Sequence, residues 1–241
     1  MADQNSDKLV ISGQALLHGL RLHGTWINAP QDVTTMLETK LHRFQETLPG
    51  ADAARTTATM AKTRVAVADR ALKSWLTKAR LVVMLARGVR WSESWVHTGF
   101  TDSKIKVPNR LDGRIALGRA LVTFFARHPE LGVPFAEITA ARGRAICERA
   151  AQSSEMLDLA KKDHFVMNQQ RQLAESDLRN AVRKVTGWLK TNLDAFDNRW
   201  ADFGIVVSVR SRPGSRNSAR QRVSTIRFSH SGPEPHHVAA A

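Results

Sequence analysis

The chain has 241 residues, of which 42% are hydrophobic, and this is enough to bury a core without disulfide bonds. Its 36 Lys and Arg outnumber its 22 Asp and Glu, giving a formal net charge of +14. This composition excludes a disordered polyelectrolyte and favours a polyanionic partner: nucleic acid, an anionic membrane surface or an acidic protein. Charge alone does not choose among these three.

The cysteine usage and the N-terminus predict where the protein works. Cys147 is the only cysteine, so an intramolecular disulfide is excluded. Residues 1–7 have no basic, apolar signal-like pattern, and the most apolar run, residues 81–86, is too short to span a bilayer. We therefore expect a cytoplasmic protein without a membrane partner, and we expect residues 1–8 to be disordered.

Apolar residues at helical spacing predict three helices in the first part of the chain. A short helix is expected within residues 9–23, and a second from Pro30 to a stop at Pro49-Gly50. The third, residues 52–87, has the clearest pattern and ends at Gly88. Its apolar stripe advances in steps of four and three: Val65, Ala68, Leu72, Trp75, Ala79, Val82 and Ala86.

A long connector and two or three further helices follow. In the connector, residues 88–109, we expect Trp91, Trp95 and Phe100 to pack back onto the helices. One helix is expected over residues 111–127, another from Pro134, and a last one from 155 to about 196, after a weak break at 152–154. The expected core residues of the last two are Phe135, Ile138, Ala141, Ala145, Ile146, Leu159, Val166, Leu173, Leu178, Val182, Val185, Leu189, Leu193 and Phe196.

The chain ends differently, with a β-like run at residues 205–209 and then a low-complexity segment rich in Arg and Ser. The predicted fold is therefore all-α: an elongated antiparallel bundle of about five to six helices over residues 9–204, with a flexible Arg-rich tail over residues 205–241. Trp-Leu, Arg-Trp and Gly-Phe or Phe-Gly pairs recur in the halves 30–100 and 108–204. They suggest an internal duplication, with coincidence as the alternative.

Two short segments resemble an uncharacterised bacterial α-helical family. These are Lys62-Thr63-Arg64-Val65 and the turn Ala201-Asp202-Phe203-Gly204. Members of that family end in a basic tail just after such a turn, although their tail is rich in Ala and Lys where this one is rich in Arg and Ser. The resemblance implies a helical fold with a basic tail and implies no activity.

Motifs for catalysis or cofactor binding do not stand out. The sequence has no phosphate-binding loop and no nucleophile elbow. Cys147 is better explained as a small buried apolar residue than as a nucleophile. The carboxylates of Asp194, Asp197 and Asp202 could ligate Mg²⁺, but helix ends collect Asp for capping. We expect no enzyme, no metal site and no cofactor.

The candidate binding residues lie in the tail and in the connector. Arg holds phosphate with two hydrogen bonds and stays charged, and the tail has no acidic residue near its six arginines: Arg210, Arg212, Arg216, Arg220, Arg222 and Arg227. Lys104 and Lys106 follow Trp91 and Trp95, a combination that can stack bases and hold phosphates, with packing of the tryptophans as the favoured alternative. The sequence thus favours a non-enzymatic protein that binds nucleic acid or another polyanion. The alternative is a structural or scaffolding protein that forms a homo-oligomer or docks to an acidic partner.

Overall fold

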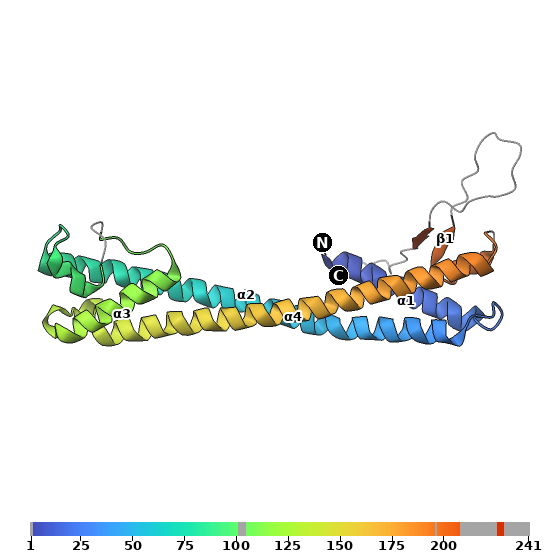
Figure 1. Cartoon of the computed structure of the whole chain (residues 1–241), viewed down its shortest axis with the longest axis horizontal. Helices are drawn as coiled ribbons and strands as arrows, with labels where there is room; N and C mark the ends of the chain where they lie inside the picture. The colour runs from blue at the N-terminus through green and yellow to red at the C-terminus, as the bar shows by residue number, and fades with distance from the viewer. Residues whose placement is uncertain (1, 101–104, 196, 208–225, 229–241) are drawn as a thin grey trace, which may run out of the picture. The chain divides into compact units, whose positions relative to one another are not determined.

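The protein is described by a computed structural model over residues 2–100, 105–195, 197–207 and 226–228. Four α-helices make up most of these residues: α1 (Ala2–His23), α2 (Gln31–Arg87), α3 (Leu111–Arg127) and α4 (Ala140–Asn192) (Figure 1). Short 3-10 helices are η1 (Glu93–Thr98), η2 (Pro129–Leu131), η3 (Pro134–Ala136) and η4 (Asn198–Ala201), and β1 (Ile205–Val207) pairs antiparallel with β2 (Ile226–Phe228). The predicted all-α class is confirmed.

Helix α2 passes through Pro49-Gly50, where the sequence predicted a stop. Proline removes one helical hydrogen bond, a loss that usually ends or kinks a helix. Here Phe44 is fully buried before the proline, and Ala51 and Ala54 are buried after it. Burial of side chains on both sides of Pro49 therefore outweighs the free-energy cost of the lost hydrogen bond. The end predicted at Gly88 is confirmed, because Gly88 adopts φ +90° and its N–H donates to the carbonyl of Met84.

Helix α4 begins at Ala140, not at Pro134, and has no break at residues 152–154. Before it, the N–H and carbonyl groups of Val133 and Ile138 bond each other at 2.9 and 3.1 Å and close a tight turn. This turn leaves Phe135 93% exposed, while Ile138 is buried as predicted. The expected core residues Ala141 and Ala145 are exposed, because the first turns of α4 bury Gly143 and Cys147 instead.

The N-terminal segment predicted to be disordered is helical from Ala2 onward. Ser6 is buried, and Arg171 of α4 donates a hydrogen bond to its hydroxyl at 3.3 Å. The prediction missed this because it weighed polarity alone.

The chain divides into two compact units. Unit 1 comprises the residues up to Ala51 and those from Met167 onward, and unit 2 comprises Asp52–Val166. Unit 1 therefore combines an N-terminal and a C-terminal part of the chain. These units do not coincide with the halves 30–100 and 108–204, and the internal duplication stays a prediction.

The core of unit 2 joins α2, α3, α4 and the connector. On α2, Ala68, Leu72, Trp75 and Ala79 are buried, which confirms the centre of the predicted stripe, whereas Ala86 is exposed. All five predicted core residues of α3 are buried: Ile115, Leu121, Val122, Phe124 and Phe125. The ring of Trp75 packs edge-on against Phe125, with 6.3 Å between ring centroids.

The core of unit 1 joins α1, the first part of α2, the last part of α4 and η4. It includes the predicted residues Leu178, Val182, Val185, Leu189 and Leu193. Ile205 is 1% exposed, so the strand pair begins where the flexible tail was expected. Phe196 lies outside the described residues.

For three residues of α4 the prediction of a core position is wrong. Leu159, Val166 and Leu173 are 65%, 45% and 66% exposed. They recur at the helical period, but on the side of α4 that faces away from its neighbours. None of the helices in the described part of the chain is long and apolar enough to cross a membrane.

Candidate nucleic-acid interface

The strongest charge feature of the described chain lies on α2 and the start of the connector. Between residues 53 and 92 the sequence has nine Lys and Arg and only one acidic residue, Asp69. We call this segment the basic stretch. Its cations are Arg55, Lys62, Arg64, Arg70, Lys73, Lys78, Arg80, Arg87 and Arg90.

The single carboxylate of the basic stretch is already paired. Nε and Nη2 of Arg114 lie 2.7 and 2.6 Å from Oδ1 of Asp69. Nη1 of the same guanidinium donates to the carbonyls of Pro108 and Asn109 at 2.8 and 2.6 Å. Arg114 is 7% exposed, so this arginine fixes α3 and the end of the connector to α2. Asp69 therefore contributes little negative charge to the surface.

Two cations of the basic stretch serve packing. Nη1 of Arg80 donates to the carbonyl of Ile105 at 3.3 Å, and the guanidinium of Arg87 lies 5.7 Å from the ring centroid of Phe124. Five others are exposed and have no acidic partner among the described residues: Lys62, Arg64, Arg70, Lys73 and Lys78. Lys62 and Lys73 are separated by eleven residues, which is about three helical turns, so both project from nearly the same side of α2.

The two connector tryptophans predicted for base stacking behave differently. Trp95 is fully buried and packs edge-on against Phe100, with 5.6 Å between ring centroids. Its assignment to a nucleic-acid surface was wrong, because a buried ring cannot stack on a base. Trp91 is 36% exposed, and its indole N–H donates to the carbonyl of Phe100 at 3.4 Å. The predicted packing of the connector onto the helices is confirmed at Trp95 and Phe100.

The remaining predicted contacts are only partly described. Lys106 is exposed beside the buried Ile105, whereas Lys104 lies outside the described residues. Of the tail arginines, Arg210, Arg212, Arg216, Arg220 and Arg222 also lie outside them. Arg227 belongs to β2, where it is paired with Val206.

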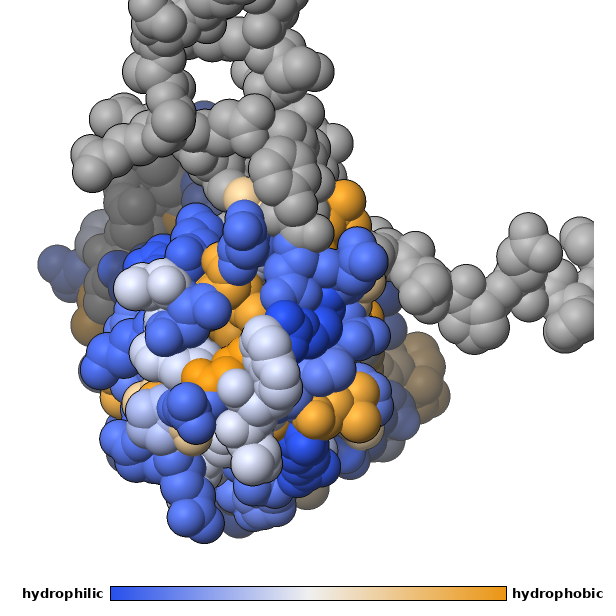
Figure 2. Space-filling model, turned by 90° about the vertical axis from the view of Figure 1, so that its right-hand side faces the viewer, coloured by the Kyte–Doolittle hydropathy of each residue, from blue (hydrophilic) through white to orange (hydrophobic). Residues whose placement is uncertain are grey.

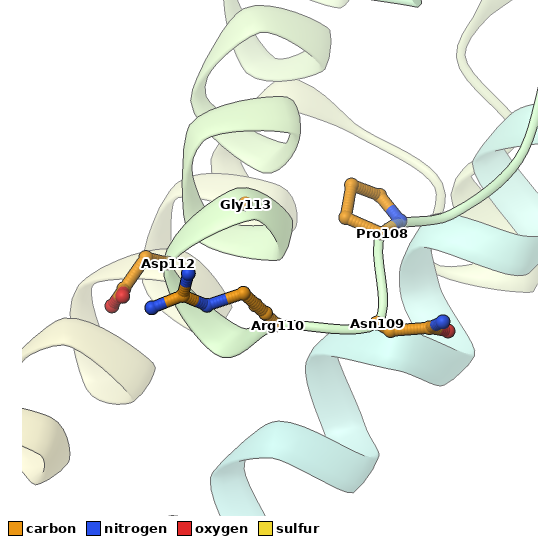
Figure 3. A pocket seen from close by; sticks show the side chains of 5 residues that line it. All are labelled: Pro108, Asn109, Arg110, Asp112 and Gly113. Carbon is orange, nitrogen blue, oxygen red and sulfur yellow. The ribbon is translucent and has the colours of Figure 1, made fainter.

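A shallow hollow adjoins the start of α3. It has a volume of about 470 Å³ and is lined by Pro108, Asn109, Arg110, Asp112 and Gly113 (Figure 3). A neighbouring hollow of about 500 Å³ includes Lys106 and Phe100 in its wall. Arg110 and Asp112 lie on the same side of the turn in Figure 3, so the first hollow has one charge of each sign. This balance does not select an anionic ligand.

The most exposed tryptophan of the described chain, Trp26, lies in unit 1. It is 65% exposed, and the guanidinium of Arg199 stacks on it at 3.1 Å from the ring centroid. Arg199 also bonds Asp197 at 2.6 Å, which holds the pKa of this carboxyl below its usual range. Arg21 and His23 likewise contact Glu38 and Asp202 at 2.6 and 2.8 Å.

Figure 2 looks onto this end of unit 1, where apolar patches alternate with hydrophilic ones. Arg199, the cation that stacks on Trp26, already bonds the carboxylate of Asp197, so among the described residues Trp26 is not accompanied by an unpaired cation of the kind found in the basic stretch. Trp26 is thus an exposed aromatic residue that the sequence analysis did not single out. Its surroundings are less suited to binding a polyanion than the basic stretch is.

The residues considered for chemistry are accounted for by packing and capping. Cys147 is 3% exposed, and burial raises the pKa of its thiol. Asp197 accepts the backbone N–H of Arg199 as the cap of η4, and Asp202 contacts His23. Within the described ranges, no three His, Cys, Asp or Glu side chains gather closely enough to hold a metal ion.

No family model, no curated protein and no solved structure matches this chain. The resemblance to the bacterial helical family therefore stays a prediction from the two short segments.

Proposed function

We propose that this protein is a non-enzymatic helical binding protein that engages nucleic acid through a basic surface. The observation that supports the proposal best is the charge pattern of the basic stretch, with nine cations and one carboxylate that Arg114 neutralises. Five of those cations are exposed without an acidic partner in the described chain. Mixed surfaces screen themselves within a Debye length of about 8 Å, whereas an unmixed one attracts phosphates over that distance.

The expected mode of binding is contact with the phosphate backbone. Lys and Arg along α2 can neutralise phosphates and release condensed counterions, without reading the base sequence. The aromatic contribution predicted from Trp95 is absent, because this ring is buried. We therefore expect strong salt dependence and little sequence preference.

The test is a set of binding titrations with fluorescent duplex DNA, single-stranded DNA and RNA at several salt concentrations. The first variant neutralises three exposed cations together: Lys62→Gln, Arg70→Gln and Lys73→Gln. The matched control removes three positive charges that already have a partner: Arg142→Gln, Lys161→Gln and Arg179→Gln, which lose Glu137, Asp158 and Glu175 respectively. Both variants have the same net charge, so only the position of the lost charges differs.

Three lost phosphate contacts should reduce the slope of log K against log salt by about 2.7 on duplex DNA, from roughly 0.9 per contact. The control should keep a slope close to that of the parent protein. If both variants weaken binding equally, attraction depends on net charge alone and the basic stretch is not the contact surface. If the parent protein binds none of the three probes at low salt, the proposed function is wrong.

The contribution of the tail to binding is tested with a separate variant in the same titrations. If all six tail arginines contacted duplex phosphates, they would contribute a slope of about 5. Truncation after Gly204 would also remove Ile205, which is buried in unit 1, so it would perturb the fold. Replacing Arg210, Arg212, Arg216, Arg220 and Arg222 by Gln in the full chain separates the tail from the core. A loss of binding confined to this variant would assign the affinity to the tail.

The alternative, a self-assembling structural protein, is favoured by a different observation. Apolar side chains at helical spacing remain exposed on α4, including Leu159 at 65% and Val166 at 45%. Such a face is expected of a helix that meets another helix. It does not compete with the basic stretch, because the two features lie on different helices.

A further inference from the structure

The outward side of α4 in unit 2 has the residue pattern of a helix-pairing seam. Glu155, Leu159, Lys162 and Val166 follow one another at steps of four, three and four, the spacing that keeps side chains on one face of paired helices. The opposite side holds Leu157, Ala160 and His164, which are buried or partly buried. We call the four outward residues the α4 seam.

The α4 seam is exposed in the single chain. Leu159 is 65% and Val166 is 45% exposed, and they are flanked by Met156 at 51% and Phe165 at 61%. Glu155 and Lys162 are also exposed, and neither has an ion-pair partner among the described residues. Four apolar side chains in one twelve-residue segment thus surround two unpaired charges of opposite sign.

We propose that the α4 seam is the interface between two copies of this chain, paired antiparallel about a two-fold axis that passes near residue 160. In that arrangement Leu159 packs beside Lys162 of the second copy, and Val166 packs beside its Glu155. Glu155 then comes within about one helical turn of Lys162 of the second copy, and symmetry makes the same contact twice. The apolar side chains of the two copies cover each other between these ion pairs.

The charges of Glu155 and Lys162 favour a second copy of the chain as the partner, and they favour the antiparallel orientation. Parallel pairing would place Glu155 beside Glu155 and Lys162 beside Lys162, which is unfavourable. A purely acidic or purely basic partner would be attracted by one of these residues and repelled by the other. Only a surface that has both charges in reverse order satisfies both residues, and a second copy turned by the two-fold axis presents that surface. The proposal is independent of nucleic-acid binding, because it does not involve the basic stretch.

The test measures the mass of the full chain in solution, without nucleic acid, by sedimentation equilibrium over a range of protein concentrations. Glu155→Lys alone and Lys162→Glu alone each convert attraction into repulsion at two symmetric contacts, so the dimer dissociation constant should rise about tenfold or more. The double variant Glu155→Lys with Lys162→Glu restores opposite charges and has the net charge of the parent. It should dimerise within a few-fold of the parent.

The apolar part of the seam is tested by Leu159→Gln together with Val166→Gln, which should abolish the dimer. Because both side chains are exposed in the single chain, circular dichroism should show unchanged helicity. The matched control is Leu85→Gln on α2, an equally drastic change at a side chain that is 89% exposed and outside the seam, which should leave the dimer intact.

A parent chain that stays monomeric overturns the proposal and leaves the seam to a different protein. A dimer that is insensitive to Leu159→Gln with Val166→Gln also overturns it. So does a double charge variant that dimerises no better than the single ones, because the antiparallel ion pairs would then not exist. None of these outcomes changes the result expected from the nucleic-acid titrations, so the two proposals fail separately.

Discussion

Gly143 is the position at which a single methyl group should disturb unit 2 most clearly. It lies in α4 where this helix crosses the indole of Trp75. A Cβ at residue 143 would come within 2.3 and 2.6 Å of Cζ2 and Cη2 of Trp75, and within 2.9 Å of Cγ2 of Val122. Trp75 is 3% exposed and is held on another side by Phe125, so the indole has little room to move.

Two effects of Gly143→Ala oppose each other. Overpacking a close-packed core costs about 1–3 kcal/mol. Replacing Gly by Ala inside a helix contributes roughly 0.5–1 kcal/mol in the other direction. Because two rigid ring atoms lie well inside contact distance, overpacking should win, and the variant should be less stable than the parent by about 1–2 kcal/mol.

Gly187→Ala is the matched control for this prediction. Gly187 lies in the same helix, is exposed, and a Cβ there would have no neighbour within 4 Å. This variant should therefore gain roughly 0.5–1 kcal/mol from helix propensity alone. Urea unfolding followed by far-UV circular dichroism compares the two.

The expected order of stability is Gly187→Ala, parent, Gly143→Ala. Adding Trp75→Phe to Gly143→Ala should recover part of the loss, because a phenyl ring lacks the two clashing atoms. If Gly143→Ala is as stable as Gly187→Ala, the close approach of α4 to Trp75 is wrong, and with it the packing of unit 2.

Three further predictions concern single side chains. Trp75→Ala should cost about 3–5 kcal/mol in urea unfolding, the usual range for emptying an aromatic core site, and an unchanged midpoint would place Trp75 on the surface. A thiol reagent at neutral pH should label Cys147 only after unfolding in urea, because burial raises the pKa of the thiol and blocks access; rapid labelling of the folded chain would contradict its burial. The hydrogen bond from Arg199 lowers the pKa of Asp197 in the folded state, so this carboxylate stabilises the fold above its unfolded pKa, and the contribution is lost as pH falls through the lower folded value. Asp197→Asn should therefore lose less stability than the parent when the pH of the unfolding experiment is lowered through the acidic range, and equal losses would refute the linkage.

The sequence predicted the helical class and much of the core because strong apolar periods survive in the fold. The stripe around Leu72, Trp75 and Ala79 is buried, and α3 has the predicted bounds and the predicted core. The predicted helix breaks are absent where tertiary packing outweighed the local conformational preference of the sequence. Pro49 is an example, since the buried Phe44 and Ala51 hold α2 together on either side of it.

The sequence analysis applied the count of charges to the tail and not to the helices, so it did not single out the basic stretch. The tail was chosen for having six arginines without an acidic residue. The same criterion applied to residues 53–92 finds nine cations with one acidic residue, Asp69. What the sequence could not supply is that Arg114, forty-five residues further on, neutralises this carboxylate. For Trp95 the favoured expectation of packing onto the helices is confirmed, and its alternative place in a base-stacking surface is wrong, because the ring is fully buried.

The exposed residues of α4 show why a correctly recognised helical period can still lead to a prediction that the wrong face is buried. In unit 2 the buried positions of this helix are small: Gly143, Cys147, Ala150 and Ala160. Small residues allow the close approach seen at Trp75, but they contribute little to an apolar pattern, so the larger Leu159 and Val166 dominated the prediction of the core. Burial of a large aliphatic side chain contributes about 1.5–3 kcal/mol, far more than burial of alanine. The more hydrophobic side of this part of α4 is thus unpaired in the single chain, and pairing with a second copy would bury it.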